Sequence, residues 1–283
     1  MRKNKKYIFL LFIMSLFALF MAGCLKEARL YGVTTWDAGC PDGARAWWDD
    51  MGLAWYNEVT DSTAHGSDAF NKDGQFINGN IVDSMFTDAA VVVWGNDHNQ
   101  IDEADVAMIF MHGSENNDRW QGSVRVDEAG DGNCKTWQGD MRFGNTDLEF
   151  LHLSSCNSLD DNQWADRWWQ SFSGLHQVNG FHGFMWIGSG LVSDYEDFAD
   201  DAFSSTLVDA WLDNMYHPDI SGTDDQCPVA YAVGANSDDT WNRMGTERYN
   251  NILSDPTTVG YWGAIYIENC DPANEDVIGT GID

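Results

Sequence analysis

The chain has 283 residues, of which 15 are basic and 45 acidic, so its formal charge is −30. A surface this negative repels nucleic acid and anionic membranes, and we therefore expect neither as a binding partner. Aromatic residues make up 13% of the chain and prolines number only five. This composition excludes a disordered chain and indicates a packed core.

The first 24 residues have the pattern of a bacterial export signal. Four basic residues precede an apolar run from Tyr7 to Phe20, which is shorter than the ~20 residues that span a bilayer. The tetrapeptide Met21-Ala22-Gly23-Cys24 resembles a lipobox, so Cys24 is the expected lipidation site, with plain secretory cleavage as the alternative. We expect a secreted or lipid-anchored cell-surface protein whose residues 25–283 form one domain.

Replacing the lipobox cysteine tests this expectation. Cys24→Ser should release the protein from the membrane fraction, because the thiol that would carry the lipid is gone. Cell fractionation and the mass of the mature N-terminus are the measurements. Unchanged membrane retention of Cys24→Ser, with normal removal of the signal, would contradict lipidation.

Short apolar runs bounded by turn residues predict buried strands along the chain. They cover residues 29–36, 91–94, 104–111, 148–155, 180–187, 228–233 and 261–267. A β-hairpin is expected around 123–126, and residues 58–80, rich in Gly, Asp, Asn and Ser, are expected to form a long surface loop.

Helices are predicted between the strands, from apolar residues three or four positions apart. They include residues 47–54 and 158–172, and a long helix that carries Phe203 to Trp211 on one face and stops before Pro218. Strands that alternate with helices indicate an α/β domain with a mostly parallel sheet. The predicted fold is a three-layer sandwich around a mainly parallel central sheet of about six strands.

Two of the predicted strands end on reactive side chains. Residues 104–111 run directly into His112-Gly113, and residues 148–155 run into Cys156. In open α/β sheets the ligand crevice lies outside the carboxyl ends of the strands. We therefore expect Cys156 and His112 to face one another there as a nucleophile and its proton-transfer partner. The backbone N–H groups of Gly113 and Cys156 would face the developing oxyanion.

The protonation state of the thiol and the choice of histidine are open to alternatives. A helix starting just after Cys156 would lower the pKa of its thiol, although a structural cysteine at the end of a core strand is the competing interpretation. His152 would lie ~13 Å from Cys156 along an extended strand, so we predict a packed core histidine. His182 falls early in its predicted strand, which would place it at the opposite edge of the sheet.

The remaining cysteines form an even set. After Cys24 and Cys156 are set aside, four are left, enough for two disulfides in an oxidising exterior. These are Cys40, Cys134, Cys227 and Cys270. Their three possible pairings cannot be separated from the sequence. Cys156 is the one thiol that we expect to be reduced.

The two strand ends resemble the signature of the caspase-like (clan CD) cysteine peptidases, which include caspases, legumains, gingipains and clostripain. The matching segments are Met108 to Gly113 and Leu151 to Cys156. Caspases proper have Gln-Ala-Cys-x-Gly, which Ser154 to Ser158 replaces here, so caspase specificity does not carry over. The segments 173–181 and 208–211 also resemble a group of uncharacterised bacterial and archaeal surface proteins with this core.

The resemblance implies a caspase-like α/β fold and a secreted or lipid-anchored cysteine peptidase with a Cys156–His112 dyad. The alternative is a surface binding lipoprotein that keeps the scaffold without chemistry, because a fold does not fix a function. The expected partner is a peptide or protein substrate.

No cofactor is expected, although Asp127, Asp131 and Asn133 have the side chains of a Ca²⁺ loop without the spacing of an EF-hand. The formal charge favours a basic residue at the cleaved position, a preference that one Arg in the site, such as Arg119 or Arg142, would reverse.

Overall fold

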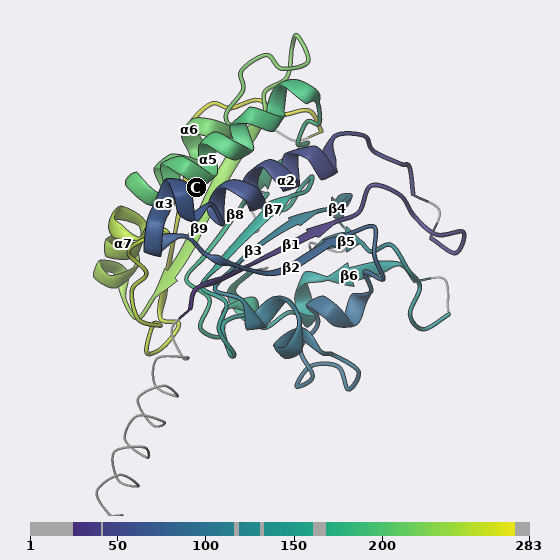
Figure 1. Cartoon of the computed structure of the whole chain (residues 1–283), viewed down its shortest axis with the longest axis horizontal. Coiled ribbons are helices and arrows are strands. Elements are labelled where there is room, and N and C mark those ends of the chain that lie inside the picture. Colours follow the sequence, from purple (N-terminus) through teal and green to yellow (C-terminus); the bar gives the residue numbers. More distant parts are fainter. Residues whose placement is uncertain (1–24, 41, 116–118, 131–132, 161–167, 275–283) are drawn as a thin grey trace, which may run out of the picture.

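The computed structural model describes residues 25–40, 42–115, 119–130, 133–160 and 168–274 (Figure 1). At its centre lies a seven-stranded sheet in the order β10-β9-β8-β7-β3-β1-β2. Five neighbouring strands, β8, β7, β3, β1 and β2, run parallel to one another. Strand β9 is antiparallel to both of its neighbours, β8 and β10. The strands are β1 (Glu27–Gly32), β2 (Asn71–Ile77), β3 (Val106–Phe110), β7 (Phe150–Ser154), β8 (Gln177–His182), β9 (Cys227–Gly234) and β10 (Tyr261–Tyr266). This mainly parallel α/β architecture is the predicted one, with seven strands in place of about six, and it agrees with a caspase-like fold.

Helices pack on one face of this sheet (Figure 1). The alternation of side chains along β3 explains the two faces, since Met108 and Phe110 pack on the helix side while Ala107 and Ile109 pack on the other. The helices are α2 (Trp48–Val59), α3 (Ser62–His65), α5 (Val192–Ser204), α6 (Leu207–Met215) and α7 (Ser237–Thr246). None of the helices in the described ranges is long and apolar enough to cross a bilayer.

The opposite face is covered by short segments and by a second, three-stranded sheet. That sheet consists of β4 (Gly113–Glu115), β5 (Trp120–Ser123) and β6 (Lys135–Trp137), which are antiparallel, as the expected hairpin near residue 123 requires. The 3-10 helices of the chain are η1 (Gly66–Asp68), η2 (Asp83–Phe86), η3 (Asp97–Asn99), η4 (Ile101–Glu103), η5 (Gln138–Asp140), η6 (Trp169–Ser171) and η7 (Ser189–Leu191).

Two predictions for the stretch of chain between β1 and β3 are wrong. Residues 58–80 contain α3 and the edge strand β2 rather than a long loop. An edge strand pairs on one side only, so β2 keeps polar, exposed side chains and lacks the apolar pattern of a buried strand. Residues 91–94 form turns, and Val93 is 94% exposed, because this apolar run has no neighbouring strand to pair with.

Three further boundaries differ from the predicted ones. The long helix expected before Pro218 is broken at Ser205, and α6 restarts where the Thr206 hydroxyl accepts a hydrogen bond from the Asp209 N–H. The strand expected at 180–187 is β8, which begins and ends earlier. Of the helix expected at 158–172, residues 161–167 lie outside the described part, while Phe172 forms a parallel bridge with Phe143.

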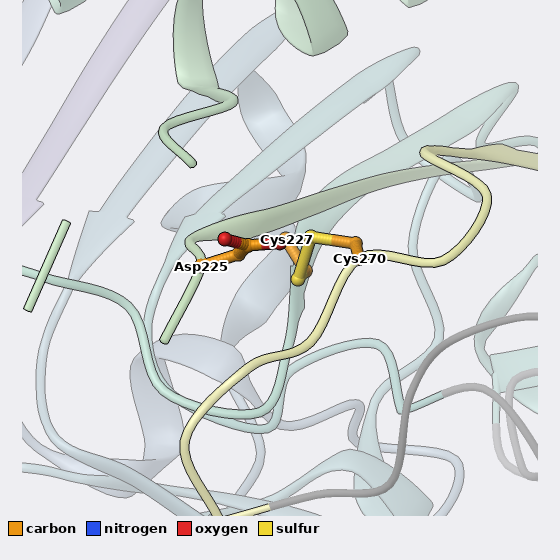
Figure 2. A group of neighbouring side chains, drawn as sticks. All are labelled: Asp225, Cys227 and Cys270. Carbon is orange, nitrogen blue, oxygen red and sulfur yellow. A yellow bond between two sulfur atoms is a disulfide. The ribbon is translucent and has the colours of Figure 1, made fainter. Parts of the chain in front are cut away.

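The two predicted disulfides are present, and Cys156 is free. Cys40 pairs with Cys134, while Cys227 at the start of β9 pairs with Cys270 after β10. Figure 2 shows the second disulfide beside Asp225. The two sulfur atoms are bonded to each other and so are not thiolate ligands for a metal. The Asp225 carboxylate accepts hydrogen bonds from the backbone N–H groups of Asp219 and Asp271. Two disulfides agree with export to an oxidising compartment.

Candidate functional site

The register of the sheet brings the predicted pair together. Phe110 at the end of β3 is paired with Ser154 at the end of β7, and these parallel strands are neighbours. His112 and Cys156 each follow two residues later. Adjacent strands lie ~4.8 Å apart, so both residues emerge at the same place on the carboxyl edge of the sheet.

Gly113 allows the two strand ends to approach one another. A Cβ atom at this position would lie 2.1 Å from the Cys156 carbonyl oxygen and 2.3 Å from the Ser155 hydroxyl. Both distances are far below van der Waals contact, and the nearer atom belongs to backbone that cannot swing away. Gly113 is therefore required by the close packing of its backbone against the turn that carries Cys156.

A cavity of about 410 Å³ opens at this edge, and His112 and Cys156 both line it. Gly113 also lines it, and the rest of the lining is apolar except for one arginine. These other residues are Arg45, Trp48, Phe184, Met185, Trp186 and Ile187. The cavity therefore offers an apolar, partly enclosed setting for one nucleophile, one imidazole and one cation.

The imidazole of His112 is held in a fixed orientation. Its Nε2 donates to the Gly43 carbonyl oxygen at 2.8 Å, and the ring centroid lies 4.9 Å from that of Trp36 and 5.1 Å from that of Trp48. A carbonyl only accepts, so Nε2 carries the proton and Nδ1 is the basic nitrogen of the neutral ring. Desolvation lowers the pKa of His112, which keeps the ring neutral at pH 7.

The environment of Cys156 differs from the one predicted. Residues 156–159 form turns, so no helix begins at the sulfur, and burial raises the pKa of the Cys156 thiol rather than lowering it. The positive charge of Arg45 opposes this rise. Both site residues lie in the described part of the chain, yet no hydrogen bond joins them; Sγ lies 3.8 Å from the Met185 carbonyl oxygen, to which it donates.

The raised pKa predicts the pH dependence of Cys156 alkylation by iodoacetamide. The rate should rise with pH to a midpoint above the ordinary cysteine value of about 8.5, because the thiolate is the reactive species. Arg45→Gln should move the midpoint higher. The control is the unfolded protein, which should show the ordinary midpoint. A midpoint below pH 7.5 in the folded protein would contradict the predicted effect of burial.

The other histidines near the central strands are structural. His152 is buried, binds Asn179 and Tyr249 through its two ring nitrogens, and has a pKa lowered to about 3, as a packed core histidine should. His182 was expected at the opposite edge of the sheet, but it is the last residue of β8 and lies at the same edge as Cys156. It is buried 3.7 Å from Asp160 and does not line the cavity.

Sequence reasoning missed Arg45, Trp48 and the wall formed by residues 184–187. Arg45 lies in the connection between β1 and α2, and Trp48 is the first residue of α2; no motif marks either of them. Residues 184–187 were assigned to the strand expected at 180–187, so they were not considered as residues that line a cavity. The arginines named as candidates, Arg119 and Arg142, do not line the cavity.

Of the three side chains considered for a Ca²⁺ loop, which are more simply explained by ordinary loop acidity, Asp131 lies outside the described residues. Besides Asp225 and its two neighbouring cysteines, one group of described side chains has the spacing of metal ligands: Glu58, His65 and Asp200. The His65 Nε2 is already bonded to Glu58 at 2.9 Å, and the ring stacks on Phe203. This interaction explains the group without an ion.

Comparisons with known proteins give a family and solved structures that are similar to this chain. A search of curated proteins gave no match. A solved structure of a secreted C11 cysteine protease from Bacteroides thetaiotaomicron, in complex with an irreversible peptide inhibitor, is similar with 11% identity and a TM-score of 0.39. The match covers 73% of this chain and 66% of that one, just under two thirds.

A family model matches residues 47–265, which make up most of the chain and include His112, Gly113 and Cys156. Its description is a domain of unknown function, DUF6345. The chain belongs to the DUF6345 family.

Proposed function

We propose that this protein is an exported cysteine peptidase, with Cys156 as nucleophile and His112 as the proton-transfer group. The carrying observation is that the two residues follow neighbouring parallel strands at the same register and line one cavity. The proposal includes anchoring through a lipid on Cys24. The two disulfides support the exported location.

The chemistry begins with a neutral thiol and a neutral imidazole. As Sγ attacks the peptide carbonyl carbon, its proton passes to Nδ1 of His112 and the carbonyl electrons move onto oxygen. The backbone N–H groups of Gly113 and Cys156 would stabilise that oxyanion. When the oxyanion collapses, the carbon–nitrogen bond breaks and His112 gives its proton to the leaving amine, which leaves an acyl-enzyme. Water, deprotonated by His112, then releases the acid and restores the thiol.

The separation of the two side chains suits this sequence. Sγ is hydrogen-bonded to Met185 and not to the imidazole, while the imidazole is held by Gly43. A peptide bond lying between them would bring its carbonyl to the sulfur and its nitrogen to the ring. The dyad is then completed by substrate, because catalytic hydrogen bonds are often loose in a free enzyme.

A second candidate is a binding protein that uses the same cavity without hydrolysis. The raised pKa of the Cys156 thiol favours it, since a protonated sulfur is a weak nucleophile.

A peptide-library cleavage screen on the fragment starting at Leu25 separates the two candidates. The peptidase should cut a defined subset of peptides, and Cys156→Ala should cut none. A Ser193→Ala variant, which changes an exposed residue of α5 outside the cavity, is the matched control and should keep its cleavage pattern. Binding of peptides without any cleavage by the wild-type fragment would favour the second candidate.

A further inference from the structure

The cavity beside Cys156 contains a single permanent charge, and it is positive. Of the nine lining residues, only Arg45 is a lysine, arginine, aspartate or glutamate. Its guanidinium donates to the neighbouring Ala44 carbonyl oxygen at 3.3 Å, and no carboxylate in the described ranges forms an ion pair with it. By contrast, Arg125 pairs with Asp37 and Arg243 with Glu247. A chain with 45 acidic residues thus leaves this one cation available in its cavity.

The position of Arg45 is set by its connection to the rest of the site. It follows Gly43, whose carbonyl holds His112, and the Cys40–Cys134 disulfide ties the start of this segment to β6. The Arg45 N–H also donates to the Thr34 carbonyl oxygen at 2.9 Å. The backbone that carries the guanidinium is therefore fixed beside the imidazole.

The part of the lining formed by residues 184–187 is apolar, and its backbone is also held by hydrogen bonds. The Trp186 N–H donates to the Gln226 side chain at 2.8 Å, and the Phe184 N–H donates to the Ala273 carbonyl oxygen at 3.2 Å. Apolar walls lower the local dielectric constant and strengthen a charge–charge contact made between them. A guanidinium binds a carboxylate through two parallel hydrogen bonds, which adds geometric selectivity.

We propose that the cavity receives an acidic side chain, Asp or Glu, from the residue before the cleaved bond, with Arg45 as the specificity-determining residue. This inference rests on the proposed function for the position of the bond, but the binding itself requires no chemistry. It reverses the preference for basic residues that the total charge of the chain favours.

The salt dependence of binding distinguishes the attraction by Arg45 from the repulsion by the net charge of the protein. At low salt the net negative charge repels an acidic peptide over long distances, and added salt screens this repulsion beyond the Debye length, which is about 10 Å at 0.1 M salt. Arg45 is an exposed residue that lines the cavity, and a hydrogen-bonded contact between its guanidinium and a carboxylate spans far less than one Debye length, so salt weakens this contact less than it weakens the long-range repulsion. Raising the salt from 0.02 to 0.2 M should therefore speed association of an acidic peptide and leave its preference over a neutral one in place.

The test measures the affinity of peptides for the Cys156→Ala protein. The readout is the change in tryptophan fluorescence on binding, since Trp48 and Trp186 line the cavity. The probes are matched acetylated tetrapeptides ending in Asp, Asn or Arg, each with a C-terminal amide so that the side chain is the sole carboxylate. The Asp peptide should bind about tenfold more tightly than the Asn peptide. Arg45→Gln should equalise the two, and Arg45→Glu should favour the Arg peptide.

Arg248→Gln is the matched control, because Arg248 lies after α7 and does not line the cavity; it should keep the tenfold preference. Equal binding of the Asp and Asn peptides, binding of none, or a preference that survives Arg45→Gln would overturn the inference. The proposed function fails separately: selective binding with no hydrolysis by the wild-type protein refutes the peptidase and leaves the acid-selective cavity. A free-acid Asn peptide that binds as the Asp peptide does would assign Arg45 to a chain terminus and overturn the side-chain proposal.

Discussion

Alanine at either Cys156 or His112 should lower kcat/KM for a cleaved peptide by at least about 10³-fold, and the double variant should be little worse than either single one. The reason is that attack by sulfur and protonation of the leaving amine belong to one reaction sequence. Steady-state kinetics of the three variants on one peptide are the measurement. Full activity in His112→Ala would contradict the dyad.

The His112 variant needs a control for structure, because the ring also packs on Trp36 and Trp48. His112→Gln keeps a side-chain N–H that can donate to Gly43 but has no titratable nitrogen. It should fold as the wild type does and be as inactive as His112→Ala. Substantial activity in His112→Gln would assign the residue a packing role and not a chemical one.

The second large effect concerns stability. The free energy of unfolding should rise as the pH falls from 9 to about 5, because several buried carboxyls have raised pKa values. Burial raises the pKa of Glu149 to about 9 and that of Asp102 to about 7. Between the ordinary and the folded pKa the folded state binds more protons than the unfolded state, so protonation stabilises the fold.

Glu149 should dominate this dependence. One of its oxygens, Oε2, is buried without a hydrogen-bond partner, and the charges of Asp105, Asp147 and Asp255 add to the effect of burial. A shift of one pKa unit corresponds to about 1.4 kcal/mol, so ionising this group costs several kcal/mol at pH 9. Below pH 6.5 buried His152, with a pKa of about 3, opposes this trend, because it resists the proton that the unfolded chain accepts. The buried carboxyls outnumber this one histidine, so the rise in stability should continue to about pH 5.

Urea unfolding at pH 5, 7 and 9 measures the effect. Glu149→Gln should be clearly more stable than wild type at pH 9 and close to it at pH 5. Asp213→Asn, which removes an exposed carboxylate on α6, should change neither value. A wild-type stability that is flat from pH 5 to 9, or lower at 5, would show that Glu149 is not held protonated.

The sequence predicts most of the central sheet because its strands are buried on both faces and therefore apolar. Residues 104–111 and 148–155 contain β3 and β7, and the parallel class follows from their alternation with helices. The polar edge strand β2 was missed for the opposite reason. Its hydrogen bonds to β1 depend on tertiary position, which its composition does not record.

The sequence likewise predicts part of the site. The two strand ends mark His112 and Cys156, since adjacent parallel strands deliver their carboxyl ends to one edge. Arg45 and Met185 come from connections whose path is set by the disulfide and by contacts with distant residues, so no local pattern identifies them. The raised pKa of the Cys156 thiol likewise depends on burial by those same connections.

The most direct test of the peptidase proposal is the site of covalent capture by an electrophilic peptide. A peptidyl acyloxymethyl ketone carrying Asp next to the ketone should form one thioether per chain, on Cys156, with loss of hydrolysis in step with labelling. Intact mass and peptide mapping give the stoichiometry and the residue. An unlabelled Cys156 in a protein that still hydrolyses peptides in the presence of the probe would contradict the account.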